Sequence, residues 1–245
     1  GNKNDSAIFD CKAELVRNNI NDKLFDKSTG LYVDGVGSSH SSLHANMFPL
    51  AFGIVPQEYA PEVVKFVKSR GMACSVYGAQ YLLEAMFKYG EAAYALDLMT
   101  ATHDRSWWNM IKVGSTMTLE AWDMKYKPNL DWNHAWGTAP TNIIARYMWG
   151  ITPASPGFST VNIRPQLADL KYSTIKVPTI VGTIKAEFKR SKNGKTTYFI
   201  NLPQKMEGNF ILPVKASEVK INGKKLKSNS CEVYLKSGRN FISIN

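Results

Sequence analysis

The stretch Trp149-Gly150-Ile151-Thr152-Pro153-Ala154-Ser155-Pro156-Gly157, at residues 149–157, separates two parts of the chain with different hydrophobic patterns. Before it, apolar residues recur at the three- and four-residue spacing that is typical of helices. After it, short runs alternate apolar and polar residues, as half-buried strands do. Because proline and glycine are common in connections, we interpret residues 153–157 as a linker. We therefore expect two domains, over residues 1–150 and 151–245.

The first part is predicted to be helical, with short and long connections between the helices. The links at residues 53–61 and at Gly90 are short, whereas those at 30–41, 100–118 and 124–134 are long and rich in polar and aromatic residues. Connections of both kinds favour helical hairpins that stack into an array or a toroid. The expected helices cover residues 7–20, 42–51, 61–70, 75–90, 91–100 and 136–149.

The second part is predicted to be an antiparallel β-sandwich, because it holds about eight short strand-like runs. Asn193-Gly194 and Asn222-Gly223 are strong signals for tight hairpin turns. The expected strands cover residues 160–163, 172–177, 180–189, 196–202, 209–213, 218–221, 232–235 and 240–244. The fold class is thus α plus all-β, in two domains.

The net charge of +10 comes entirely from the second part. Residues 1–150 carry a net charge of −1 and residues 151–245 a net charge of +11. The basic stretches lack the interleaved aromatic residues of a nucleic-acid-binding surface. Their lysines fall between apolar strand positions or in turns, as Lys224 and Lys225 do, so we expect solvated strand faces and edges. An anionic partner is the alternative, and no nucleic acid is expected.

The three cysteines, Cys11, Cys74 and Cys231, are widely spaced. This spacing excludes a disulfide scaffold and a Cys-x-x-Cys zinc site, and we expect neither a metal nor a cofactor. Cys74 is expected to be a buried structural thiol. The sequence also holds no run of about 18 apolar residues, so no membrane span is expected.

The residues suited to chemistry gather in the first part, where all six tryptophans lie between Trp107 and Trp149 and all four histidines are found. Two nearby segments, 116–123 and 131–136, place Glu120 among several tryptophans. Aromatic faces suit the C–H faces of sugars, and an apolar wall raises a carboxyl pKa, which favours acid–base chemistry. A packed aromatic core is the competing interpretation. In it, Asp123 only caps or pairs with Lys125, and His134 only caps a helix.

Two motifs resemble those of a known enzyme family. Gly114-Ser-Thr-Met-Thr-Leu-Glu-Ala-Trp-Asp123 resembles the segment of family 78 α-L-rhamnosidases that runs roughly Gly-Ala-Thr-Thr-x-Trp-Glu-x-Trp-Asp. Asn133-His134-Ala-Trp-Gly137 resembles the family's Asn-His motif that ends in glycine. Weaker similarity extends over Leu43–Pro56, over Arg105-Ser-Trp-Trp, where the family has Pro-Ser-Trp, and over Phe158–Pro165.

The resemblance implies part of an (α/α)6 toroid followed by a β-sandwich. It also implies an inverting hydrolase of terminal α-L-rhamnosides, in which Glu120 is the general base and His134 contacts the rhamnose. Trp122 and Asp123 would flank the base. The candidate site residues are Glu120, Trp122, Asp123, His134 and Trp136. Because the inner helices of such a toroid start near its pocket, residues near helix starts are weaker candidates: His40, His44 and Tyr77.

The chain also departs from the family's pattern. Leu119 stands where the family often has tryptophan, and the Asp-Cys-Pro-x-x-(Asp/Glu)-Arg segment that carries the general acid does not occur. Six or seven helices are half of what a six-hairpin toroid needs. We therefore expect a chain that begins midway through the catalytic domain and is incomplete alone.

The resemblance implies a partner that is a rhamnose-containing glycoside, oligosaccharide or polysaccharide, and substrates of that kind imply a secreted or periplasmic protein. The competing hypothesis is a non-catalytic carbohydrate-binding or assembly protein. In either case an open half-toroid would expose apolar helix faces, which favours self-association.

Overall fold

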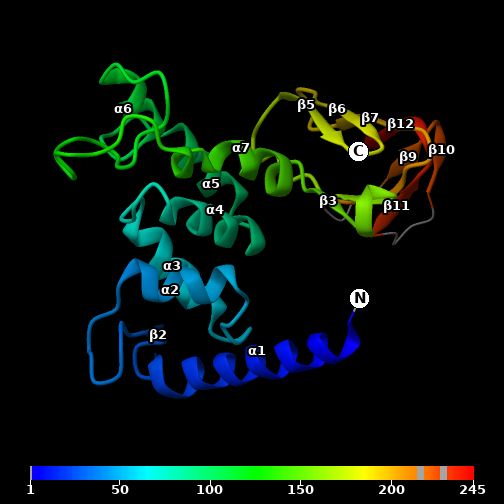
Figure 1. Cartoon of the computed structure of the whole chain (residues 1–245). Coiled ribbons are helices and arrows are strands. Elements are labelled where there is room, and N and C mark those ends of the chain that lie inside the picture. Colours follow the sequence, from blue (N-terminus) through cyan, green and yellow to red (C-terminus); the bar gives the residue numbers. More distant parts are fainter. Residues whose placement is uncertain (1, 214–217, 227–230) are drawn as a thin grey trace. The chain divides into compact units, whose positions relative to one another are not determined.

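The structure is a computed structural model that describes residues 2–213, 218–226 and 231–245. The chain forms two compact units, Gly1–Ala139 and Pro140–Asn245 (Figure 1). Helices make up most of the first unit, and two β-sheets make up most of the second. The fold class expected from the sequence is thus confirmed, whereas the domain boundary at residue 150 stays a prediction.

The helices of the described chain agree with the sequence pattern at most positions. Ser42 caps the second helix, since its hydroxyl accepts a hydrogen bond from the Ala45 N–H. The α-helices are α1 (Lys3–Leu24), α2 (Leu43–Ala51), α3 (Ala60–Arg70), α4 (Gly78–Lys88), α5 (Ala92–Thr100), α6 (Trp107–Lys112) and α7 (Ala139–Ile143). A two-stranded hairpin of β1 (Phe25–Asp26) and β2 (Leu31–Tyr32) follows α1.

Two helix predictions were wrong in part. Helix α6 lies inside the stretch 100–118 that was expected to be a loop, and its six residues are too few to show a period. Ser106 begins it by accepting a hydrogen bond from the Asn109 N–H. The single helix expected over 136–149 is instead a 3-10 turn (Ala135–Gly137), then α7, then a π-helical turn (Ile144–Met148).

The core of the first unit lies around α2, which packs against both α3 and α4. Asn46 of α2 is fully buried and ties the helix to strand β2. Its side-chain oxygen accepts a hydrogen bond from the Tyr32 N–H, and its amide donates to the carbonyl oxygens of Tyr32 and Ser42. The apolar core residues around it include Met47, Leu50, Val63, Val67, Leu82, Leu83 and Met86.

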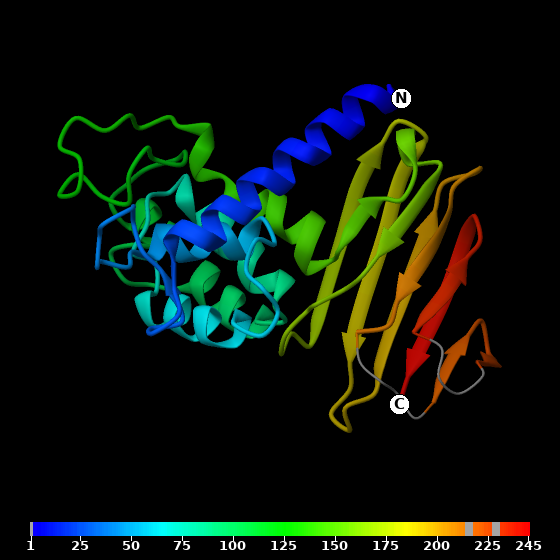
Figure 2. The ribbon, with the colours of Figure 1, turned by 90° about the horizontal axis from the view of Figure 1, so that it is seen from below.

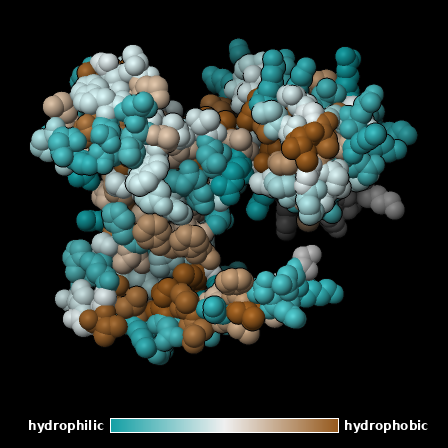
Figure 3. Space-filling model, in the orientation of Figure 1, coloured by the Kyte–Doolittle hydropathy of each residue, from teal (hydrophilic) through white to brown (hydrophobic). Residues whose placement is uncertain are grey.

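Helix α1 differs from the other helices. All of its residues are described, and none of them is buried. Helical spacing groups Ile8, Leu15, Val16 and Ile20 in a rough apolar stripe, of which the first three are more than half exposed and Ile20 is partly buried. Figure 3 shows apolar side chains over α1 and beside it, at the lower edge of the view. Such a surface fits the expected self-association, which stays a prediction. Within the described ranges, no helix is long and apolar enough to span a bilayer.

The second unit contains a six-stranded and a four-stranded sheet (Figure 2). The larger sheet has the order β10-β9-β12-β7-β6-β5 and is antiparallel at each pairing. Its strands are β5 (Tyr172–Thr179), β6 (Gly182–Arg190), β7 (Thr196–Leu202), β9 (Val219–Ile221), β10 (Lys224–Lys225) and β12 (Gly238–Ile244). The two lysines expected in a turn thus form an exposed edge strand.

The smaller sheet has the order β11-β8-β4-β3. Its strands are β3 (Ile151–Pro153), β4 (Thr160–Ile163), β8 (Glu207–Ile211) and β11 (Glu232–Leu235). Strands β4 and β8 run parallel, which departs from a wholly antiparallel sandwich. The linker predicted over residues 153–157 was wrong at its start, because Pro153 is the last residue of β3 and pairs with Val161 of β4. Ile151, at the other end of β3, is buried. Proline fits there because β3 is an edge strand.

The two sheets share an aromatic core. Tyr198 of β7, in the larger sheet, packs against Phe210 of β8, in the smaller sheet, with ring centroids 4.9 Å apart. Phe188 of β6 lies 5.0 Å from Tyr198, and all three rings are buried. The alternating burial of β6 and β7 follows from this contact, because every second side chain faces the opposite sheet.

Gly150 begins the second unit's first strand pair under a tight steric constraint. It has a φ of 63°, and a Cβ atom there would lie 2.2 Å from the carbonyl oxygen of Arg164. The Gly150 carbonyl also accepts a hydrogen bond from the Arg164 N–H. Trp149 beside it is fully buried and donates from its indole N–H to the Ser173 hydroxyl. Glycine is therefore required where the helical pattern ends.

We expect Gly150→Ala to lower the free energy of unfolding by about 3 kcal/mol, through left-handed strain together with displacement of the Arg164 backbone. Urea unfolding followed by circular dichroism measures the loss. Gly194→Ala is the matched control, because Gly194 has a φ of 85° and none of the described atoms lies within 4 Å of its Cβ position. It should cost about 1 kcal/mol. Equal losses in the two variants would contradict the steric argument.

Candidate functional site

Backbone hydrogen bonds join the two motif segments. The Glu120 N–H donates to the Asp131 carbonyl oxygen at 3.0 Å, and the His134 N–H donates to the Thr118 carbonyl oxygen at 2.8 Å. The Thr118 hydroxyl donates to the His134 carbonyl oxygen at 2.7 Å. The segments lie antiparallel without forming a regular strand, so the loop between them is closed into one unit.

Gly137 explains why the second motif ends in glycine. A Cβ atom there would lie 2.6 Å from the Thr118 Cβ and 3.0 Å from the Leu119 carbonyl oxygen. The Gly137 carbonyl oxygen accepts a hydrogen bond from the Trp107 indole N–H at 2.6 Å. Leu119, at the position where the family often has tryptophan, is completely buried. Close backbone approach thus holds the two motifs against each other.

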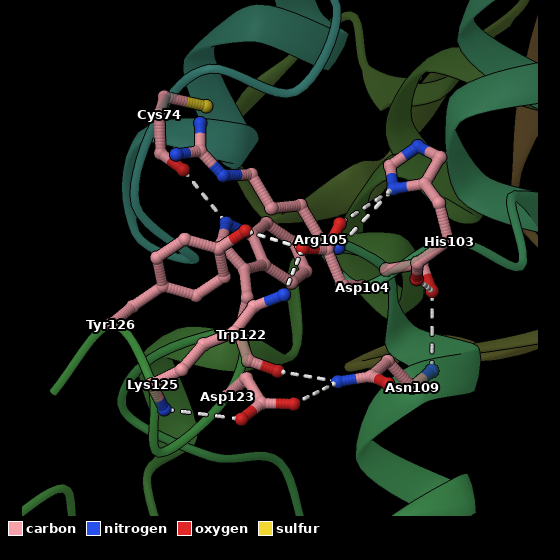
Figure 4. Close-up of polar contacts among 10 residues, drawn as sticks. Cys74, His103, Asp104, Arg105, Asn109, Trp122, Asp123, Lys125 and Tyr126 are labelled. Carbon is pink, nitrogen blue, oxygen red and sulfur yellow. Dashed lines mark hydrogen bonds and ion pairs between the residues drawn. The ribbon is translucent and has the colours of Figure 1, made fainter. Parts of the chain in front are cut away.

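Trp122 and Asp123 are anchored to the helical framework (Figure 4). The buried Trp122 ring donates its indole N–H to the Cys74 carbonyl oxygen at 2.7 Å. The Asn109 amide of α6 donates to the Trp122 carbonyl oxygen and to the Asp123 carboxylate. The Lys125 N–H donates to the other Asp123 oxygen. These bonds lower the pKa of Asp123, with Asn109 as the largest cause.

These segments border a cavity of about 530 Å³ in the first unit. The start of α2 contributes His44, and the residues before α4 contribute Cys74 and Tyr77, in agreement with helix starts that face a pocket. The candidates Glu120, Trp122 and Trp136 also line it. Three residues that the sequence did not single out complete the polar and aromatic lining: Arg105, Tyr126 and Lys127.

Glu120 is held at both carboxylate oxygens. One oxygen forms an ion pair with the Lys127 ammonium, and the other accepts a hydrogen bond from the Asp131 N–H at 3.1 Å. The Glu120 side chain is 25% exposed to solvent. The hydrogen bond from Lys127 is the main cause that lowers the pKa of Glu120, followed by that from Asp131. The pKa rise expected from an apolar wall was therefore wrong, because Lys127 outweighs desolvation.

His134 and Trp136 lie side by side at the edge of the site. Their ring centroids are 4.9 Å apart, and Trp136 is also 5.0 Å from Tyr77. Trp136 is 62% exposed, so the packed-core interpretation does not hold for it. His134 precedes a 3-10 turn, but among the described residues its side chain makes no capping hydrogen bond. Its Nε2 is buried and lacks a partner there as well.

The structure does not bring all the candidates to the cavity surface. Asp123 and His134 are absent from the described residues that line it, although Asp123 follows the lining residue Trp122 and the His134 ring contacts the lining residue Trp136. The weaker candidate His40 also lies outside that lining, and its ring pairs with the Asp34 carboxylate at 2.6 Å. Asp123 matches the interpretation in which it serves structure, because its oxygens bond to Asn109 and to the Lys125 N–H.

A network around Asp104 holds Tyr126, one of the residues that line the cavity (Figure 4). Its carboxylate forms an ion pair with Lys125 and accepts a hydrogen bond from the Tyr126 hydroxyl at 2.6 Å. The Arg105 guanidinium lies over the Tyr126 ring, 4.7 Å from its centroid. These contacts join the end of one long connection to the middle of another, which no spacing in the sequence reveals.

Cys74 is buried as expected, and burial raises the pKa of its thiol to about 12. The thiol is therefore neutral near pH 7 and is a poor nucleophile. Within the described part of the chain, His, Cys, Asp and Glu residues do not gather in a group of three that would hold a metal ion.

The chain is similar in fold to three solved α-L-rhamnosidases. The α-L-rhamnosidase from Dictyoglumus thermophilum is 19% identical to this chain, with a TM-score of 0.85. The match covers 100% of this chain and 29% of the Dictyoglumus chain. The native enzyme from Aspergillus terreus is 20% identical, with coverages of 98% and 27% and a TM-score of 0.74. The Streptomyces avermitilis enzyme complexed with L-rhamnose is 18% identical, with coverages of 88% and 22% and a TM-score of 0.71.

The chain thus spans less than a third of the length of these proteins. Among curated proteins, none matches it significantly. A model for the bacterial alpha-L-rhamnosidase C-terminal domain matches residues 150–227. A model for the bacterial alpha-L-rhamnosidase 6 hairpin glycosidase domain matches residues 1–148, which is more than half of the chain. The chain therefore belongs to the bacterial α-L-rhamnosidase family.

Proposed function

We propose that the chain is the C-terminal portion of an inverting glycoside hydrolase that cleaves terminal α-L-rhamnosides, with Glu120 as the general base. The observation that carries the proposal is the position of Glu120 in a cavity lined by Trp122, Trp136 and Tyr77. The complex of the Streptomyces avermitilis enzyme with L-rhamnose supports a rhamnose-containing substrate. An inverting enzyme needs one carboxylate to activate water and another to protonate the leaving group.

The environment of Glu120 suits a base that must be ionised. Lys127 and the Asp131 N–H both favour the carboxylate form and lower its pKa. In the proposed reaction, a Glu120 oxygen takes a proton from water while the water oxygen attacks the anomeric carbon, and the glycosidic bond breaks as the second carboxyl group protonates the leaving oxygen. Because Lys127 holds one oxygen and Asp131 the other, a water has to displace or share one of these contacts.

The neighbouring residues receive distinct roles in the proposal. Trp136, with its exposed ring, offers a flat apolar face to the C–H face of the sugar. Trp122 forms a fixed wall, and Asp123 holds the loop that carries Glu120. His134 binds a rhamnose hydroxyl through its Nε2, which is buried and has no hydrogen-bond partner among the described residues.

We expect Glu120→Gln to lower kcat/KM for an aryl α-L-rhamnoside by about 10²- to 10⁴-fold in the hydrolase that carries this chain, because the amide cannot accept the proton. Glu62→Gln is the matched control, since Glu62 lies on α3 and pairs with Lys65 outside the cavity lining. Retained activity in Glu120→Gln would exclude the assignment. Proton NMR of the first product tests inversion, which should give the β-anomer of rhamnose.

We expect Lys127→Met to raise the pKa of Glu120, because it removes the main contact that lowers this pKa. Carbon NMR of the side-chain carboxyl in this chain measures the midpoint. In the active hydrolase, the acidic limb of kcat/KM should move to higher pH, since the base then protonates sooner on acidification. Lys65→Met, which removes an equal charge on α3, should leave both unchanged. An unchanged titration midpoint in Lys127→Met would show that a group other than Lys127 lowers the pKa of Glu120.

The chain alone is proposed to lack catalysis, because Glu120 is the one carboxylate among the described residues that line the cavity. We expect its turnover of aryl α-L-rhamnoside to be about 10⁴-fold or more below that of a complete enzyme. Calorimetric titration with rhamnose should still detect binding. Binding without turnover in every longer form would favour the competing function, a carbohydrate-binding protein. Robust turnover by this chain would refute the missing-acid argument.

A further inference from the structure

The cavity contains a cation that no described carboxylate neutralises. Three basic side chains line it, His44, Arg105 and Lys127, against the single described carboxylate Glu120. Lys127 forms the ion pair with Glu120. Within the described residues, the Arg105 guanidinium has neither an ion pair nor a hydrogen bond, and its contact is the Tyr126 ring.

The acidic neighbours of Arg105 are engaged elsewhere. Asp104 forms its ion pair with Lys125 and accepts a hydrogen bond from the Tyr126 hydroxyl, and its other oxygen lies 3.8 Å from the His103 ring nitrogen. Figure 4 shows the Arg105 side chain extending past Tyr126 toward Cys74. The Cys74 thiol, with a pKa of about 12, is neutral near pH 7 and supplies no counter-charge.

Arg105 is also held in position before any ligand arrives. Its guanidinium lies 4.7 Å from the centroid of the Tyr126 ring, and the hydroxyl of that ring is fixed by Asp104. Stacking on an aromatic face leaves the N–H groups at the edge of the guanidinium plane available.

A guanidinium fork matches the planar geometry of a carboxylate, with two parallel N–H···O bonds. Rhamnose itself carries no acidic group, so an anion in the substrate would belong to the group that the rhamnose is attached to, and in an oligosaccharide or polysaccharide that group is the next sugar. Resting on the proposed function, we infer that Arg105 binds the carboxylate of a uronic acid next to the rhamnose, and that the substrates are acidic rhamnosides. Arg105 is a specificity residue in this inference and takes no part in proton transfer.

The test compares two ligands that differ only in the carboxylate. These are the methyl glycosides of α-L-rhamnosyl-glucuronic acid and of its carboxyl-reduced form, α-L-rhamnosyl-glucose, with the same linkage. Calorimetric titration of this chain should give about 10- to 100-fold tighter binding of the acidic disaccharide, the scale of hydrogen bonds to a charged group. Higher salt should reduce the preference, because it screens the partly exposed pair.

Arg105→Met and Arg105→Gln should each abolish the preference while leaving the binding of the neutral disaccharide within about 3-fold. Two variants guard against a folding defect in one, which circular dichroism detects. Lys112→Met is the matched control, because this substitution removes the same charge. Lys112 is exposed at the end of α6 and does not line the cavity. It should keep the preference.

The outcomes separate this inference from the proposed function. Equal binding of both disaccharides by the unaltered chain, or a preference that persists in a folded Arg105→Met or Arg105→Gln variant, overturns the role of Arg105 alone. A preference lost equally in Lys112→Met would assign it to general charge and also overturn the inference. If the unaltered chain binds neither disaccharide, the proposed rhamnoside function and this inference fall together.

Discussion

The hydrogen-bonded contact between residues 118–120 and 131–134 is the constraint on which the site depends. It brings the Asp131 N–H to the Glu120 carboxylate and closes the loop that carries Lys127. The same contact requires glycine at 137, since the Thr118 side chain and the Leu119 backbone occupy the space of a Cβ atom. Two motifs that are separate in the sequence are thus one structural element, and each would lose its geometry without the other.

Electrostatics then distinguishes the two cations of the cavity. Lys127 forms an ion pair with the Glu120 carboxylate and lowers its pKa. Arg105 is oriented by the Tyr126 ring, and its N–H groups stay available to a ligand. The difference follows from the surroundings, because Asp104 is already occupied by Lys125 and Tyr126. A single cavity therefore has one charge suited to the reaction and another suited to the choice of substrate.

The sequence predicted the elements whose burial follows a period. Strands β4, β7 and β11 have the bounds expected from alternation, and α2 lies within its expected range. Helix α6 was not predicted because its six residues are too few to show a period. Strand β3 was not predicted because Pro153 suggested a linker. Glu120, Trp122 and Trp136 were found through motifs, whereas Arg105 and Lys127 owe their positions to tertiary contacts between irregular segments. No local pattern records such contacts.

The parallel pairing of β4 with β8 has a consequence for the order of folding. Residues 160–163 pair with residues 207–210, and the β5–β6–β7 meander lies between them in the chain. The meander needs only local hairpins, but the smaller sheet needs closure of a loop of more than forty residues. Since loop-closure entropy precedes the gain from non-local contacts, the β5–β6–β7 meander is the natural template and the smaller sheet forms in a late step. Until that step, the rings of Tyr198 and Phe188 have no opposing sheet to cover them, and the half-formed unit is at its most prone to aggregate.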